Sequence, residues 1–426
     1  ETGNPIIYTN GDNDTFPLWY NQETEGFRTD ARTCNLSYLQ TDWYIDQMKR
    51  PAYDSPSLPI TWDRMEYVEG TNEYVPVRPE YKKSIDALYA EAEKQALSGN
   101  TEALVNVKKE FGENPYELKN ILKYWIRSKN EDLKVIPTDS IVMKVDKEAV
   151  RRSGMMIPGD SIPDYMHISL KGKRALYKSE LMMLEMLAEA NWERPIYIAV
   201  SVGPENQLNM GNHFIQEGLT YRFTPFDTDK LGVKIDSEKM YDNLMNKFKF
   251  GGINNPDIYI DETVMRMCQT HRRMFIQLAT QLIKEGKKDK ALKALDYCSE
   301  VIPSTTVPHD YIMSSSKEMA DDYLALGEKE KGEAILNDLA NKSVEYITWY
   351  LSLDDQRLQG SYEDCLRNFY ILDEINKSLA RANAAGGVQG EGEQQKKSDM
   401  ASHYAKKFED LYEVFNKRVG GGAGRK

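Results

Sequence analysis

The sequence predicts an α/β sandwich with a mainly parallel sheet, followed by an all-α domain of tetratricopeptide-like helical repeats. Two strand-rich segments separated by a helical stretch indicate the sandwich. Near residue 255 the pattern changes, and helical periodicity then continues to residue 419. We therefore expect an α/β domain at residues 1–254 with a helical insert at about 80–130, helical repeats at 255–419, and a disordered tail at 420–426.

The first fifty residues predict alternating strands and helices. Short apolar runs bounded by turn residues indicate the strands, and Gly26 is placed to end the first helix. The expected order is strand, helix, strand and helix, at Ile6–Thr9, Phe16–Glu25, Ala31–Leu39 and Thr41–Arg50.

The remainder of the α/β domain begins with the helical insert. Asn114, Pro115 and Glu117 form a capping-box pattern, which predicts the start of a helix there. Strands are then expected at Ser140–Val145, Tyr165–Leu170, Pro195–Val200 and Gly218–Thr224, with a helix at Ala175–Ala190.

A repeat begins in the stretch from Phe275 to Pro303, which follows the tetratricopeptide spacing. Its small residues would let two antiparallel helices approach, with a turn at Gly286. Further turn glycines, Gly327 and Gly360, follow at intervals of 41 and 33 residues, so the first linker carries an insertion. Residues 384–397 predict a flexible loop, and residues 398–419 a terminal capping helix.

Composition limits the class of protein. The formal net charge is −12, which argues against a nucleic-acid partner or an anionic membrane surface. No stretch approaches the roughly 18–20 apolar residues of a membrane helix. No signal peptide is visible and the chain opens on Glu1, so we expect a fragment whose targeting or membrane segments lie outside it. The four cysteines are far apart, which indicates neither a zinc site nor a disulfide framework.

The triplet Asp12-Asn13-Asp14 follows the first predicted strand and has two interpretations. As a DxD motif, Asp12 and Asp14 would hold a divalent metal against a diphosphate, as in some nucleotide-sugar glycosyltransferases. In the simpler interpretation, Asp14 or Thr15 caps the helix that begins at Phe16. No third carboxylate or histidine lies nearby in the sequence, and no other cofactor is indicated.

Three further residues are candidates for ligand binding. His213 follows a predicted strand on a polar loop, where a binding residue or a structural imidazole would both fit. Arg151 and Arg152 precede Gly154 in a loop that could grip an anionic group or serve as a solvated hinge. The sequence contains no GxSxG, HExxH, P-loop or GxGxxG motif.

Residues 9–48, TNGDNDTFPLWYNQETEGFRTDARTCNLSYLQTDWYIDQM, resemble a signature of a family of multi-pass membrane proteins common in Bacteroidetes. That family was long known only as a domain of unknown function and is similar to protein O-mannosyltransferase-type membrane glycosyltransferases. Pro195–Ile198 and Glu217–Arg222 also fit, so the resemblance covers roughly residues 5–225. It implies a lipid-linked sugar donor and catalytic carboxylates upstream of Glu1, and it transfers no catalytic residue to this chain. It also implies that this region faces the periplasm at the inner membrane.

Three functional hypotheses follow. In the first, this region is a non-catalytic accessory part that positions a protein or glycan acceptor through its helical repeats, beside its own membrane domain and without nucleic acid. In the second, Asp12 and Asp14, with His213 as a further ligand, form a metal-dependent sugar or phosphate enzyme site. In the third, the repeats brace the α/β domain as a purely structural scaffold.

Overall fold

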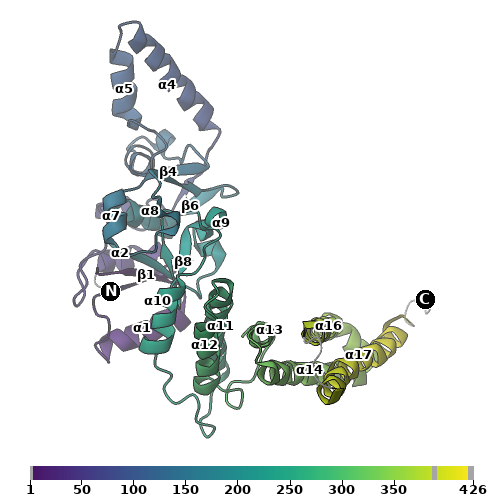
Figure 1. Ribbon diagram of the computed structural model, residues 1–426. Coiled ribbons are helices and arrows are strands. Elements are labelled where there is room, and N and C mark those ends of the chain that lie inside the picture. Colours follow the sequence, from purple (N-terminus) through teal and green to yellow (C-terminus); the bar gives the residue numbers. More distant parts are fainter. Residues whose placement is uncertain (1–2, 386–390, 421–426) are drawn as a thin grey trace. The chain divides into compact units, whose positions relative to one another are not determined.

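The computed structural model describes residues 3–385 and 391–420 (Figure 1). The chain forms two compact units, Glu1–Asp236 and Ser237–Lys426, here called the α/β unit and the helical unit. All four cysteines are buried, with free thiols. Within the described ranges, no helix combines the length and apolarity needed to cross a membrane.

A five-stranded mixed sheet forms the centre of the α/β unit. Its strand order is β2-β1-β7-β9-β8, at Arg32–Asn35, Ile6–Thr9, Ile196–Ala199, Thr220–Phe223 and Phe214–Gln216. Strand β1 is parallel to β2 and β7, whereas β9 is antiparallel to both β7 and β8. The prediction of a mainly parallel sheet is therefore wrong. Only residues 217–219 connect β8 to β9, and so short a connection permits only antiparallel pairing.

Helix α1 (Asp12–Glu23) joins β1 to β2 and begins four residues earlier than predicted. Gly11 is its N-terminal flanking residue and has a φ of 93°, a conformation that glycine adopts readily. No side chain caps this end, so the prediction that Asp14 or Thr15 is the cap is wrong. The predicted second strand ends at Asn35 and is followed by the 3₁₀ turn η1 (Tyr38–Gln40) and helix α2 (Asp42–Met48).

Helix α8 (Lys178–Ala190) is the most buried helix of the α/β unit, since ten of its thirteen residues are buried. The Tyr8 hydroxyl of β1 donates a hydrogen bond to Met186 Sδ, 3.7 Å away, which places α8 against the sheet. The Glu185 carboxylate of α8 accepts hydrogen bonds from the backbone N–H and hydroxyl of Thr61. Within the long segment between β2 and β7, helix α8 therefore connects the sheet to the stretch around Thr61.

That segment holds α3 (Arg64–Tyr67), β3 (Tyr74–Pro76), α4 (Tyr81–Leu97), α5 (Glu102–Phe111), α6 (Leu118–Asn120), the π-helical turn η2 (Ile121–Ile126), η3 (Glu131–Leu133), β4 (Ser140–Lys144), α7 (Lys147–Arg152), η4 (Pro158–Asp160), β5 (Tyr165–Ser169) and β6 (Ala175–Tyr177). Strands β3 and β6 pair antiparallel, as do β4 and β5, so these strands form separate small sheets. Helices α4 and α5 form the predicted insert, a hairpin that extends away from the strands of the unit in Figure 1. The predicted capping box is wrong, because Glu117, not Asn114, accepts the cap hydrogen bond, from Asn120 N.

Three short helical turns complete the α/β unit: η5 (Pro204–Asn206), η6 (Gly211–His213) and α9 (Thr228–Leu231). The helical unit contains α10 (Ser237–Asp242), the π-helical turn η7 (Asn243–Lys247), α11 (Glu262–Lys284), α12 (Lys288–Val301), α13 (Ser316–Ala325), α14 (Lys329–Ser352), α15 (Asp355–Gly360), α16 (Tyr362–Ala385) and α17 (Glu391–Gly420).

Tetratricopeptide-like repeats are not confirmed in the helical unit. Gly286 and Gly327 turn the chain between α11 and α12 and between α13 and α14, with φ values of 76° and 88°. The helix lengths do not repeat, since α13 has 10 residues and α14 has 24. Gly360 ends the short helix α15 and makes no equivalent turn. Of the predicted flexible loop at 384–397, residues 391–397 belong to α17 and 386–390 lie outside the described residues, as do 421–426 of the predicted tail.

Candidate functional site

The three parallel strands β2, β1 and β7 end at the same edge of the sheet. Strand β1 lies between the other two, and the chain leaves it through α1 towards β2 on one side, while β7 occupies the other side. In open α/β sheets such a point, outside the carboxyl ends of the strands, is where ligands bind. Polar residues lie within two positions of each strand end: Asn10 after β1, Ser37 after β2 and Ser201 after β7.

A buried polar network fixes this edge. The hydroxyls of Thr9 and Thr15 lie 2.7 Å apart, and Asn35 Nδ2 donates to Thr15 Oγ1 at 2.9 Å and to the Gly11 carbonyl at 3.2 Å. Thr9, Thr15 and Asn35 are fully buried. Asn35 Oδ1 accepts from the backbone N–H of Ser37 at 2.9 Å. Because each polar group has a partner, the loops after β1 and β2 are held rigidly.

Asp14 connects two of the strand ends. Its Oδ2 accepts hydrogen bonds from Asn10 N at 3.0 Å and from Ser201 Oγ at 2.8 Å, which joins the turn after β1 to the turn after β7. Asp12 is exposed. Across the part of the chain that the structure describes, no group of three or more His, Cys, Asp or Glu side chains is placed to hold a metal. The metal prediction therefore depends on the two aspartates alone.

His213 is buried, with 4% of its surface exposed. Its Nδ1 lies 3.0 Å from the Phe226 carbonyl, and its Nε2 lies 3.2 Å from both the His167 carbonyl and Asn212 Nδ2. Burial lowers the pKa of His213, so the ring is neutral at neutral pH and Nδ1–H can donate to Phe226. In this tautomer Nε2 accepts from Asn212 Nδ2, so both ring nitrogens have hydrogen-bond partners within the protein.

Arg151 and Arg152 lie in the last turn of α7, not in a loop, and both are exposed. Arg151 pairs with Glu148 on the same helix, and Arg152 pairs with Glu193 at 3.3 Å. Among the described residues, no hydrogen bond or ion pair joins any two of Asp12, Asp14, Arg151, Arg152 and His213. The structure therefore does not bring the predicted site residues together.

A polar hollow of about 730 Å³ opens at the strand ends. This edge hollow is lined by Asn10, Leu36, Ser37, Gln40, Lys173, Ala175, Tyr177, Ser179, Glu180, Met183, Glu205 and Asn206. Lys173 Nζ and a Glu180 carboxylate oxygen lie 2.6 Å apart, so these two charges neutralise each other. Ser37 Oγ donates to Asn10 Oδ1 at 2.6 Å. The volume is within the range of small-molecule sites.

A second hollow, of about 530 Å³, adjoins the first at Gln40. This Trp43 hollow is lined by Gln40, Thr41, Asp42, Trp43, Glu69, Gly70, Glu73 and Lys178. The Lys178 side chain is 1% exposed and its Nζ lies 2.6 Å from Glu73 Oε1. Gln40 Oε1 accepts from Ser179 N at 3.1 Å, which fixes the wall between the two hollows.

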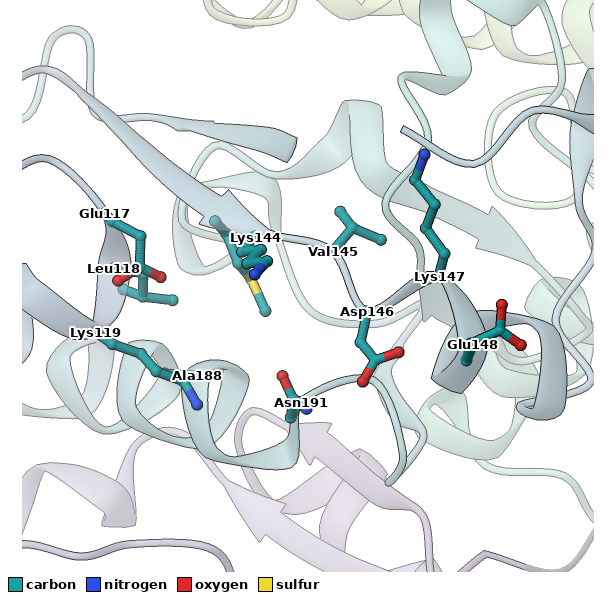
Figure 2. A pocket seen from close by; sticks show the side chains of 11 residues that line it. Glu117, Leu118, Lys119, Lys144, Val145, Asp146, Lys147, Glu148, Ala188 and Asn191 are labelled. Atoms are coloured by element: carbon teal, nitrogen blue, oxygen red, sulfur yellow. The ribbon is translucent and has the colours of Figure 1, made fainter. Parts of the chain in front are cut away.

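A third hollow, of about 550 Å³, lies where α6, β4, α7 and the end of α8 meet (Figure 2). Its acidic groups already serve the local helices. Asp146 accepts from Ala149 N at 2.9 Å and caps α7, and Glu117 caps α6. Burial raises the pKa of Glu117, while the nearby Lys119 and Lys144 oppose that shift. These carboxylates therefore have a structural role.

The residues that shape the two adjoining hollows were not predicted as site residues. Gln40 and Trp43 lie inside the 9–48 signature, which was the one available signal. Glu73 and Lys178 are 105 positions apart, and nothing in the sequence indicates that they pair.

The fold and site define a two-part protein, in which an α/β unit with a polar hollow at its strand ends accompanies a helical unit. Over residues 1–242 the sequence matches the family described as TMEM260-associated domain 2. The match spans more than half of the chain, which therefore belongs to this family of membrane-protein-associated domains. No curated protein and no solved structure matches. The match carries no information on O-mannosyltransferase similarity or on Bacteroidetes.

Proposed function

We propose that this chain is the extracytoplasmic accessory region of a membrane glycosyltransferase-like protein and that it positions a protein or glycan acceptor. The catalytic groups and the lipid-linked donor belong to the membrane part in this proposal, which places the present region on the periplasmic face of the inner membrane. Membership of a domain family associated with a membrane protein supports this arrangement.

The observation that carries the proposal is the edge hollow. Its volume of about 730 Å³ suits a ligand, and it lies at the strand ends, where α/β folds bind ligands. Lys173 and Glu180 in its wall neutralise each other, and Ser37 and Asn10 are hydrogen-bonded together. Most of the polar and charged groups in this wall are thus committed to one another and build a shaped surface. Binding is therefore the role that this geometry favours.

The helical unit offers a second surface for an acceptor. Tyr346, Trp349 and Tyr370 are each more than half exposed, on α14 and α16. Exposed aromatic side chains are enriched where proteins bind partners. The helical unit can therefore contact an acceptor through these side chains even though its helices do not form a regular tetratricopeptide array.

The test uses the full-length parent protein in its own membrane. The acceptor probe is the extracytoplasmic protein fraction of cells that lack the parent protein. Sugar transfer from the endogenous lipid-linked donor is measured as the concentration of this fraction is varied. Ser37→Trp and Asn206→Trp fill the edge hollow from different walls, and Ser304→Trp, at an exposed position of the helical unit, is the control.

We expect both hollow variants to raise the KM for the acceptor fraction and to leave kcat unchanged. A surface that only holds the acceptor binds it equally well in the ground state and the transition state, so its loss affects KM alone. An unchanged KM in both variants would refute positioning by this hollow. A fall in kcat at saturating acceptor would instead place the hollow in the chemistry and would also overturn the proposal. Thermal unfolding of each purified variant shows whether the chain still folds.

A further inference from the structure

We propose that the edge hollow and the Trp43 hollow form one groove that binds an uncharged oligosaccharide. This inference rests on the proposed function, since it names the chemistry of what that site recognises. It assigns the ligand to the α/β unit, whereas the sequence placed the acceptor on the helices.

Gln40 lines both hollows, so the two adjoin at this side chain and an extended ligand would pass over it. Hydrogen bonds fix this side chain, because its Oε1 accepts from Ser179 N and its Nε2 lies 3.4 Å from the Glu73 carbonyl. Each hollow has the volume of a small-molecule site on its own. Two such hollows side by side suit an extended ligand made of several similar units.

Exposed aromatic rings stand at both parts of the groove. Trp43 is 54% exposed and Tyr177 is 59% exposed. Trp43 makes ring contacts with Tyr38 at 5.9 Å and Tyr44 at 5.5 Å, which restrict its orientation before a ligand binds. A rigid aromatic ring with a free face binds apolar C–H surfaces at low entropic cost. The faces of sugar rings present such surfaces.

The charge of the groove selects against phosphorylated ligands. Its walls contain five carboxylates and two lysines, a formal charge of 2 − 5 = −3, from Asp42, Glu69, Glu73, Glu180, Glu205, Lys173 and Lys178. Both lysines already pair with carboxylates of the groove. Within the described chain, Glu69 and Glu205 form no ion pair with a cation. Free carboxylates repel phosphates but accept strong hydrogen bonds from hydroxyl groups.

Amide side chains supply the complementary donors. Asn10 and Asn206 line the edge hollow; Asn10 Oδ1 accepts from Ser37 Oγ, and Asn206 Nδ2 donates to Glu205 Oε1 at 3.1 Å. Carboxylates, amides and exposed aromatic rings together match a ligand with many hydroxyl groups and apolar ring faces. A nucleotide sugar or a lipid diphosphate would instead require unpaired cations.

The experiment uses the purified 426-residue chain. Short uncharged oligosaccharides of hexoses and N-acetylhexosamines are screened by saturation-transfer NMR and by quenching of tryptophan fluorescence. Uridine diphosphate and inorganic phosphate form the anionic arm, at low and high salt. We expect millimolar or tighter saturable binding of an oligosaccharide that does not depend on salt, and no saturable phosphate binding.

Matched variants locate the ligand. Trp43→Ala and Tyr177→Ala should each weaken oligosaccharide binding about three- to tenfold, the loss expected for one aromatic contact. Trp349→Ala and Tyr370→Ala, which are 54% and 57% exposed on the helical unit, should leave it unchanged. Glu69→Gln retains the shape of the side chain and tests whether the carboxylate is used.

Three results would overturn the inference: no saturable oligosaccharide binding, salt-sensitive binding of the phosphate probes in the groove, or loss of sugar binding in Trp349→Ala but not in Trp43→Ala. These outcomes are distinguishable from failure of the proposed function. If Ser37→Trp raises the KM for the acceptor fraction while no oligosaccharide binds, the hollow still positions an acceptor and the acceptor is not recognised through sugar.

Discussion

Asp322 in the helical unit should make that unit less stable as the pH rises. This carboxyl group lies on α13 and is 9% exposed, and its Oδ2 accepts a hydrogen bond from Thr280 Oγ1 of α11 at 2.7 Å. Burial raises the pKa of Asp322 from 3.8 to about 6, against the opposing effect of the Thr280 hydrogen bond. Asp321 and Glu318 raise it further, and Lys284 lowers it.

The direction and size of the effect follow from linkage. Because the folded pKa is above the unfolded value, the stabilisation due to the protonated group is complete below pH 3.8 and is lost as the pH rises through about 6. The shift from 3.8 to about 6 is about two units, and at 1.36 kcal/mol per unit the full effect is about 3 kcal/mol. Replacing Asp322 with Asn removes the ionisation and retains an oxygen acceptor for Thr280.

We therefore expect Asp322→Asn to raise the melting temperature of the helical unit at pH 8 by about 6–12 °C, and to have little effect at pH 4. Thermal unfolding followed by circular dichroism across this pH range measures the effect, and hydrogen exchange of α11 and α13 assigns it to this unit. Asp321→Asn is the matched control, because Asp321 is more exposed and pairs with Lys317. Parallel pH profiles for wild type and Asp322→Asn, or a loss of stability at pH 8, would refute the reasoning.

Two further predictions concern single polar side chains. Asp14→Asn should lower the free energy of unfolding by about 1–2 kcal/mol in urea, since the carboxylate joins two strand ends, whereas exposed Asp12→Asn should not. Calorimetric titration of the same proteins with Mn²⁺, Mg²⁺ and Ca²⁺ tests the metal alternative, which saturable heat lost in both variants would support. Arg272→Met should lower the free energy of unfolding in urea by about 3 kcal/mol, because buried Arg272 donates to the carbonyls of Ile302, Val307 and Pro308. Arg272→Lys keeps a cationic donor and should lower it by less. Equal midpoints for wild type and Arg272→Met would contradict this account.

The sequence located local elements well and their pairing poorly. The runs at β1 and β7 are apolar and bounded by turn residues, so both strands were predicted within a residue or two. Strand β8 has only three residues, too few to show a pattern, and it was missed. The pairing of β4 with β5 away from the central sheet joins residues 21 to 29 positions apart, and hydrophobic periodicity does not encode such pairing.

For the candidate site, too, the sequence indicated the local position of residues but not their long-range partners. Asp14 was singled out from its position after a strand, and it does lie at the strand ends. Its partner Ser201 comes from a turn 187 residues away, so the sequence could not distinguish a metal ligand from a strand-end bridge. The burial of His213 also depends on distant carbonyl groups, which a polar local sequence conceals.

The pairing of β1 with β7 has a consequence for biosynthesis. Ile6 of β1 is aligned with Ile196 of β7, so the central strand lacks one neighbour until 190 more residues have been added. At translation rates of roughly 5–20 residues per second, that delay is about 10–40 s, far longer than the collapse of a short chain. During this time β1, which is a central strand in the folded sheet, has one unpaired edge, and such an edge is a template for aggregation. We therefore expect the nascent chain to depend on a chaperone that covers this edge until β7 emerges.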